Sequence, residues 1–315
     1  MLLNETFNYR LALKVSGKQF LIYLLLSSLV AGLYFFLSVK WLEIPFLPIG
    51  MLGTAVAFFV GFKNNSAYDR YWEARKFWGS FTNVSRNISL QIVTYLNDRH
   101  TDIHSQKLDL NEEKKKFLYR QIAYINCVRM NLRERGEIEE LKPFLSEVEF
   151  REILQKSNKS NYLLQKHTEQ LEFLASNKAL EHFFHIEIMH SLKELLDIQG
   201  GCERIKNTPF PRQYATYSRL FTQIFCFVLP FGISTEFIKV FGVEMVWLAI
   251  PFSTLICWIF MAMEIIGSNT EKPFADIAAA VNINAISRNI ERDIKEILNE
   301  TDLPPALQPK NDIIL

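Results

Sequence analysis

Four long apolar runs, separated by charged segments, dominate the pattern of hydrophobic and polar positions along the chain. The first two cover residues 20–39 and 44–62 and contain no charged side chain, and the others cover about 216–241 and 245–263. About 20 apolar residues in an α-helix cross the hydrocarbon core of a bilayer. We therefore predict four transmembrane helices. Pro230 lies inside the third, where neighbouring helices can satisfy the carbonyl that a proline leaves free.

The polar segments also predict helices, because none alternates with period two for long enough to form a strand. Ser146 and Glu149 have the spacing of a capping box. Gly200-Gly201 is expected to end a long helix, and residues 276–300 have an amphipathic pattern. The predicted fold class is all-α. The predicted organisation is a cytosolic N-terminus with two membrane helices (1–79), the second extending into the cytosol, then a helical cytosolic region (80–208), two further membrane helices (209–268), and a cytosolic C-terminal helix and tail (269–315).

Basic residues beside the apolar runs predict how the chain lies in the membrane. They gather before the first run, after the second and before the third, whereas the two short hairpin loops carry only Lys40 and Lys239. Segments rich in Lys and Arg stay on the cytoplasmic side. We therefore expect both termini and the long middle region in the cytoplasm. The flanking basic residues are Arg10, Lys14, Lys18, Lys63, Arg70, Arg75, Lys76, Arg204, Lys206, Arg212 and Arg219.

Composition agrees with this division and argues against several function classes. The chain of 315 residues is 49% hydrophobic yet 22% charged, and its formal net charge of +1 gives no argument for nucleic-acid binding. No GxSxG, P-loop or dinucleotide pattern occurs, so we predict no enzymatic activity and no cofactor. The four cysteines form no CxxC pair, and His182 and His190 of HFFHIEIMH are two turns apart, so no metal site is expected.

The second apolar run carries two neighbouring stripes with helical spacing. Thr54, Phe58 and Phe62 lie four residues apart along one stripe, and Gly53, Ala57 and Gly61 along the next. Small residues at this spacing let another helix approach closely. The phenyl rings have two interpretations. They face lipid or core, or identical helices around an axis turn them into a pore, where they form an apolar constriction.

Residues 61–79 continue this helix with alternating aromatic and charged side chains. A helix that leaves the membrane and becomes buried among other helices explains the mixture, because buried charges need partners. Glu264, at the inner end of the fourth run, is expected to pair with a base from this stretch, such as Arg70 or Arg75, or to line a cytosolic vestibule. The expected network of charges and aromatics comprises Asp69, Arg70, Trp72, Glu73, Arg75 and Glu264.

Three segments resemble the bestrophin family, and its bacterial branch in particular. They are NNSAYDRYWEARKFWG, CERIKNTPFPRQY with the later LPFG, and MEIIGSNTEKPF leading into ISRNIERDI. They occur in the family's order across nearly the whole chain. The resemblance implies a homopentameric ion channel in the plasma (inner) membrane of a bacterium. It implies four membrane helices per subunit, of which the second lines a narrow neck.

Carried over by position, the resemblance makes Thr54, Phe58 and Phe62 the neck. Ile205, Thr208 and Phe210 become candidates for a second constriction at the cytosolic exit. Animal bestrophins bind calcium through a run of acids after a Pro-Phe pair, and the corresponding run here, PFADIAAAVN, holds only Asp276. Calcium takes six to eight oxygen ligands, so we predict a channel that calcium does not activate.

The resemblance favours chloride and other small anions as the permeant ions. Phenyl edges carry partial positive charge and favour anions, whereas phenyl faces favour cations, so a sodium-conducting channel is the alternative. A coupled transporter is a second alternative, disfavoured because no inverted repeat is visible. The expected partners are monovalent ions, membrane lipids and further copies of the chain.

Overall fold

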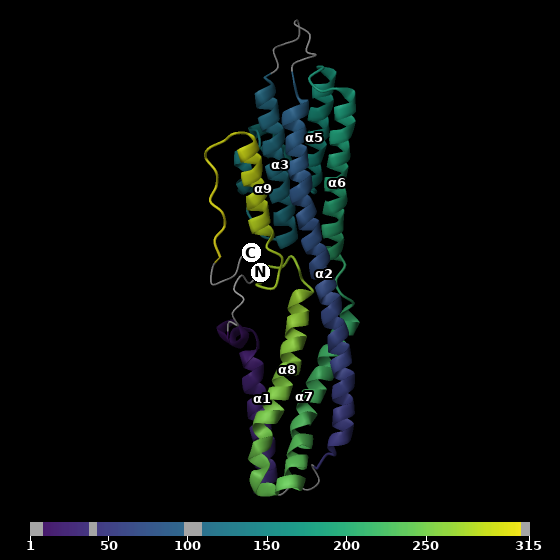
Figure 1. The fold of residues 1–315 in the computed structure, drawn as a ribbon, viewed down its shortest axis with the longest axis vertical. Helices are drawn as coiled ribbons and strands as arrows, with labels where there is room; N and C mark the ends of the chain where they lie inside the picture. The colour runs from purple at the N-terminus through teal and green to yellow at the C-terminus, as the bar shows by residue number, and fades with distance from the viewer. Residues whose placement is uncertain (1–8, 38–42, 98–108, 310–315) are drawn as a thin grey trace. The chain divides into compact units, whose positions relative to one another are not determined.

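The computed structural model describes residues 9–37, 43–97 and 109–309, and within them all regular secondary structure is helical (Figure 1). The predicted all-α fold class is confirmed. The α-helices are α1 (Tyr9–Leu37), α2 (Phe46–Tyr95), α3 (Leu110–Arg133), α4 (Glu147–Leu154), α5 (Lys159–Ser176), α6 (His182–Asn207), α7 (Arg212–Phe241), α8 (Ala249–Thr270) and α9 (Ile283–Ile297), and the 3-10 helices are η2 (Ile138–Phe144) and η3 (Val243–Leu248).

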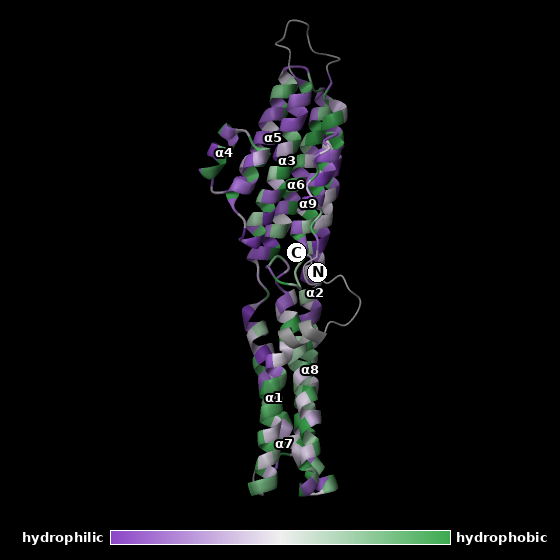
Figure 2. Cartoon of the chain, turned by 90° about the vertical axis from the view of Figure 1, so that its left-hand side faces the viewer, coloured by the Kyte–Doolittle hydropathy of each residue, from purple (hydrophilic) through white to green (hydrophobic). Residues whose placement is uncertain are grey.

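The chain divides into two compact units. Of the described residues, those within 4–71 and 209–272 form the first unit, called here the membrane unit, and those within 72–208 and 273–315 form the second, the polar unit. Helix α2 is continuous through the charged stretch and contributes to both units. Hydrophobic colours dominate α1, α7 and α8 of the membrane unit, whereas α3, α5, α6 and α9 mix both classes (Figure 2).

Within the described residues, four helical segments are long and apolar enough to cross a membrane, which confirms the four predicted spans. They are Val15–Leu37, Phe46–Tyr95, Arg212–Phe241 and Val243–Thr270. The second is far longer than a bilayer requires, since a helix rises 1.5 Å per residue and 20 residues already cross the hydrocarbon core.

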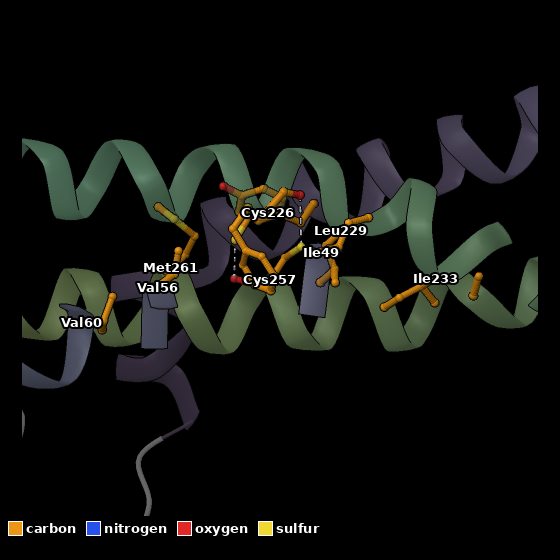
Figure 3. Close-up of a cluster of buried hydrophobic side chains, with 11 residues drawn as sticks. Ile49, Val56, Val60, Cys226, Leu229, Ile233, Cys257 and Met261 are labelled. Atoms are coloured by element: carbon orange, nitrogen blue, oxygen red, sulfur yellow. Dashed lines mark hydrogen bonds between the residues drawn. The ribbon is translucent and has the colours of Figure 1, made fainter. Parts of the chain in front are cut away.

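The core of the membrane unit joins all four spans (Figure 3). At its centre Cys226 of α7 and Cys257 of α8 each direct the thiol at the other's backbone carbonyl, with Sγ···O distances of 3.7 and 3.3 Å. Gly53 of α2 lets the helix approach α7 closely, because a Cβ added there would lie 2.8 Å from Cε2 of Phe225. The core residues are Tyr23, Ile49, Val56, Val60, Phe225, Cys226, Leu229, Ile233, Ala249, Cys257 and Met261.

Two predicted helix ends in the polar unit were wrong. Helix α6 does not end at Gly200-Gly201 but continues to Asn207. Gly201 is there for packing, because a side chain at this position would overlap the Phe77 ring. A glycine that permits close approach and a glycine that ends a helix look alike in the sequence.

The C-terminal amphipathic helix is also shorter than predicted. It covers only Ile283–Ile297, and the segment from 273 to 282 forms turns. The guanidinium of Arg133 holds these turns by donating to the carbonyls of Phe274 and Val281, at 3.3 and 3.0 Å, and of Ala275. Tertiary hydrogen bonds thus replace the helical ones in this segment.

The capping box of the polar unit is confirmed. The Ser146 hydroxyl accepts from the Glu149 N–H, and the Glu149 carboxylate accepts from the Ser146 N–H, each at 3.3 Å. The same carboxylate binds the buried guanidinium of Arg120, whose Nη1 also donates to Gln170 Oε1 at 2.6 Å. Burial alone would raise the pKa of Glu149, but Arg120 and Ser146 stabilise the charged form and lower it below its ordinary value.

Candidate ion pathway

The stripe of Thr54, Phe58 and Phe62 forms an exposed face on the membrane half of α2. Phe58 is 63% exposed and Phe62 51%, and their rings meet edge to face at a centroid distance of 4.4 Å and an interplanar angle of 66°. The Thr54 hydroxyl donates to the Gly50 carbonyl of its own helix at 3.1 Å, and Thr54 is exposed. The stripe lies opposite the buried positions Val56 and Val60.

The exposed face of α2 continues with polar side chains toward the inner end. Asn65 and Asp69 are both exposed. They follow Phe58 by seven and eleven residues, about two and three helical turns, so they return to the same side of the helix. A carboxylate facing hydrocarbon is costly. The inner end of this side of α2 is therefore better suited to contact with water than with hydrocarbon.

The small-residue series splits between two different surroundings. Gly53 is buried and packs against Phe225 within the chain. Ala57 and Gly61 are exposed, and a Cβ added at Gly61 would meet no atom within 4 Å. Only Gly53 therefore serves packing inside the chain, and the other two leave an open, shallow surface beside the phenylalanine stripe.

Glu264 pairs with a base of residues 61–79, as predicted, but that base is Lys63 and not one of the two examples, Arg70 and Arg75. The Lys63 ammonium donates to Glu264 Oε1 and, at 2.8 Å, to Ser268 Oγ. The Ser218 hydroxyl donates to Glu264 Oε2 at 3.1 Å. Lys63 and Glu264 are each 2% exposed. Every charged group of this buried site has a partner, as burial of charge requires.

The helical spacing of the sequence already placed Lys63 on the buried side of α2. Lys63 follows Val56 and Val60 by seven and three residues and precedes Ala67 by four, so it belongs to the buried stripe of α2. The two examples named for the partner of Glu264, Arg70 and Arg75, lie further along, where the helix was expected to leave the bilayer. The structure places the first base after the apolar run on the core side instead.

The remaining members of the expected network lie in separate places. Arg70 donates through Nε to the Glu271 carbonyl at 3.3 Å in the membrane unit. Glu73 pairs with Arg204 in the polar unit, at 2.5 Å. Asp69 and Trp72 are exposed, and Arg75 is half-buried. Residues 61–79 thus contribute different side chains to the two units and do not form one cluster.

The three candidates for a cytosolic constriction also differ in their surroundings. Ile205 is 3% exposed in the single chain. Thr208 is exposed at the end of α6. Phe210 is half-buried, with its ring edge-on to Tyr214 at 5.5 Å. A constriction at Ile205, Thr208 or Phe210 stays a prediction.

The segment after Pro273 does not suit a bound calcium ion. Its carbonyl oxygens at Phe274, Ala275 and Val281 accept from Arg133. Its acid, Asp276, pairs with Arg135. Within the described residues, no group of three or more His, Cys, Asp or Glu could hold a metal ion. Arginine nitrogens therefore occupy the oxygens that a cation would need.

The fold and this site define a helical multi-span membrane protein whose second span exposes an aromatic stripe followed by exposed polar groups. The chain belongs to the bacterial and fungal branch of the bestrophins, because the family described as "Bacterial/Fungal Bestrophin protein" matches residues 9–296. The resemblance inferred from the sequence is confirmed.

Relatives and solved structures agree with this membership. The chain is 28% identical over 298 residues to the voltage-dependent anion channel-forming protein YneE of Escherichia coli (strain K12), covering 94% of this chain and 90% of that protein. It is 30% identical to the voltage-dependent anion channel-forming protein RSc3414 of Ralstonia nicotianae, covering 84% and 82%. A bacterial bestrophin homologue from Klebsiella pneumoniae shares the fold, with a TM-score of 0.79, 23% identity, and coverage of 89% and 97%.

Proposed function

We propose that five copies of this chain surround an axis and form a passive channel for small anions, chloride foremost, with α2 lining the neck. The observation that carries the proposal is the exposed α2 face, where Phe58 and Phe62 are 63% and 51% exposed and are followed by the exposed Asn65 and Asp69. The names of the relatives, voltage-dependent anion channel-forming proteins, support anions as the permeant ions. The number five rests on the resemblance to bestrophins.

In this proposal the neck is an apolar constriction between two wetter regions. Thr54 lies at its outer end, the two phenyl rings narrow it, and Asn65 and Asp69 follow at its inner end. An ion passing such rings loses water without gaining strong ligands, so an apolar constriction conducts when it is wet and closes by dewetting. The paired rings can also present their positive edges to an anion.

The proposed setting is the inner membrane, with both termini and the polar unit in the cytoplasm. The excess of Lys and Arg beside the inner ends of the spans supports this orientation. Lipids cover the outward faces of the apolar helices. Calcium is not an activator in this proposal, because Arg133 and Arg135 already engage the oxygens of the segment after Pro273.

A flux assay with a matched control tests the neck. Purified protein in liposomes is expected to conduct chloride without a coupling gradient, and Phe58→Ala with Phe62→Ala is expected to raise the flux several-fold by widening the constriction. The control is Phe227→Ala with Phe252→Ala, which removes two rings of similar exposure, 57% and 54%, from α7 and α8. If both double variants conduct like the natural protein, α2 does not form the neck through this stripe.

Cation conduction is the second candidate function, and Asp69 favours it. Rings of carboxylates are typical of cation-selective pores, and symmetry would repeat the exposed Asp69 in every copy. Reversal potentials across a sodium chloride gradient separate the two candidates. A potential near the chloride equilibrium value supports the proposed anion channel, and one near the sodium value supports the alternative.

A further inference from the structure

The membrane unit has an open aromatic groove on one flank of the α2 stripe. Phe59 lies at its edge, and α7 supplies Tyr214, Tyr217 and Phe221 around a cavity of about 500 Å³. The Phe59 ring meets the rings of Tyr214 and Phe221 at centroid distances of 6.1 and 6.2 Å. Tyr217 is 56% exposed. The groove is therefore a preformed aromatic surface that stays open in the single chain.

The other flank of the same stripe carries no large side chain. A helix turns by about 100° per residue, so Ala57 lies about 100° to one side of Phe58 and Phe59 about 100° to the other. Gly61 is one turn after Ala57 on the same flank, and both are exposed. Since a Cβ at Gly61 would meet no atom within 4 Å, this flank is a shallow strip of helix backbone.

A ring of copies that turn Phe58 toward one axis brings these two flanks together. Each copy then meets the next by a heterologous contact, one flank of α2 against the opposite flank of its neighbour. We propose that the groove beside Phe59 binds the Ala57–Gly61 flank of α2 in a second copy of this chain. The inference rests on the proposed channel and adds the surfaces through which its ring closes.

The two surfaces match in depth and in size. Rotation about an axis along the membrane normal keeps every residue at its own depth, and Phe59 contacts Tyr214 and Phe221, so the groove lies at the depth of Ala57 and Gly61. Small residues let a neighbouring helix come close. Aromatic rings then supply a large contact area against the exposed backbone.

A second copy fits the groove better than lipid chains do. The groove borders the face of α2 that continues into Asn65 and Asp69, which are exposed and poorly suited to hydrocarbon. Gln213 and Ser218 also contribute to its lining. The groove lies between this exposed polar side of α2 and the helix core, a position suited to protein–protein contact. Acyl chains are expected against the uniformly apolar helices.

Cysteine cross-linking tests the proposed contact. Gly61→Cys is combined with Tyr217→Cys in one full-length chain, and the purified oligomer is treated with a short bismaleimide. Head-to-tail contacts are expected to give a ladder of cross-linked species that ends at the size of the closed ring. Ala57→Cys with Tyr217→Cys repeats the test if the first variant does not fold. Cross-linking through the four natural cysteines is expected to be low, because all four are buried.

The control pair is Gly61→Cys with Met263→Cys. Met263 is 43% exposed and precedes Glu264, the partner of Lys63, so it lies near the depth of Gly61 but on α8. A ladder from the Tyr217 pair that is absent from the control supports the contact. An intact oligomer that gives no ladder, or equal ladders from both pairs, overturns it and leaves the groove to lipid. Flux is measured separately, so loss of conduction tests the channel proposal and leaves the cross-linking result unaffected.

Discussion

Lys63 of α2 and Glu264 of α8 form an ion pair that is almost completely withdrawn from solvent, with each side chain 2% exposed. Lys63 is the residue directly after Phe62. The pair therefore fixes the rotation of α2 about its axis at the point where the phenylalanine stripe ends. Ser218 adds a contact from α7, so three helices meet at one charged site.

Removal of one partner of this pair is expected to destabilise the protein strongly. Lys63→Met or Glu264→Leu alone leaves a buried charge without its partner, at a cost of about 3–5 kcal/mol, whereas the double variant Lys63→Met with Glu264→Leu recovers most of it. Thermal unfolding in detergent measures both. The surface pair Glu236–Lys239, with exposures of 42% and 54%, is the control, and its removal is expected to change stability by less than about 1 kcal/mol. Additive losses in the buried double variant would contradict the coupling.

Asp69 is expected to influence ion selectivity. In the proposed ring its carboxylate is repeated around the inner end of the neck, where it attracts cations and repels anions. Asp69→Asn is expected to shift the reversal potential toward the chloride value, and Asp69→Lys further in the same direction. Glu244→Gln, a change in η3 away from the α2 stripe, is the control. Unchanged potentials in both Asp69 variants would show that ions do not pass this position.

His167 makes the stability of the polar unit depend on pH. Burial lowers the pKa of its imidazole well below 6.5, with a further contribution from Arg120, and both ring nitrogens are without a hydrogen-bond partner among the described residues. Below about pH 6.5 the unfolded chain binds a proton there that the folded chain does not, so stability falls as the pH decreases.

The slope of that loss is measured by chemical unfolding between about pH 6.5 and pH 5 and approaches 1.4 kcal/mol per pH unit. His167→Leu, which keeps an apolar group against Phe117, is expected to flatten it. Carboxylates such as Glu149, whose pKa is lowered, contribute their own loss only at lower pH. An unchanged slope in His167→Leu would assign the pH dependence to other groups.

Two adjacent glycines in α6 are expected to respond oppositely to alanine. Gly201→Ala forces the new methyl group into the Phe77 ring and destabilises the polar unit, by up to about 3 kcal/mol if the ring is displaced. Gly200→Ala meets no atom within 4 Å and gains helix propensity, up to about 1 kcal/mol. Unfolding midpoints of the two variants decide this, and equal shifts would contradict the packing role of Gly201.

Arg133 is expected to matter for structure, while calcium is expected to have no effect on flux. Arg133→Lys retains the charge but lacks the planar fork that reaches three carbonyls, so the segment after Pro273 should become susceptible to limited proteolysis. Arg135→Ala removes a pair in which the arginine is 75% exposed and serves as the control. Flux in micromolar calcium and in a calcium chelator should be equal, and activation by calcium would overturn the assignment.

The local patterns of the sequence determined the all-α membrane fold class, the four spans and the spacing of the α2 stripe. These depend on periodicities of a few residues: runs of apolar residues as long as a bilayer is thick, and side chains that recur every four positions. The capping box at Ser146 was visible for the same reason, because its partners lie three residues apart.

Tertiary structure decided which of those residues meet each other. Lys63 and Glu264 are 201 residues apart, and several bases near the membrane boundary were equally good partners by sequence. Gly53 and Gly61 have the same local pattern, yet only Gly53 finds Phe225 against it. Gly201 was taken for a helix end because the Phe77 ring that explains it lies on another helix. Partner choice depends on which helix faces pack together, and spacing along one helix does not carry that information.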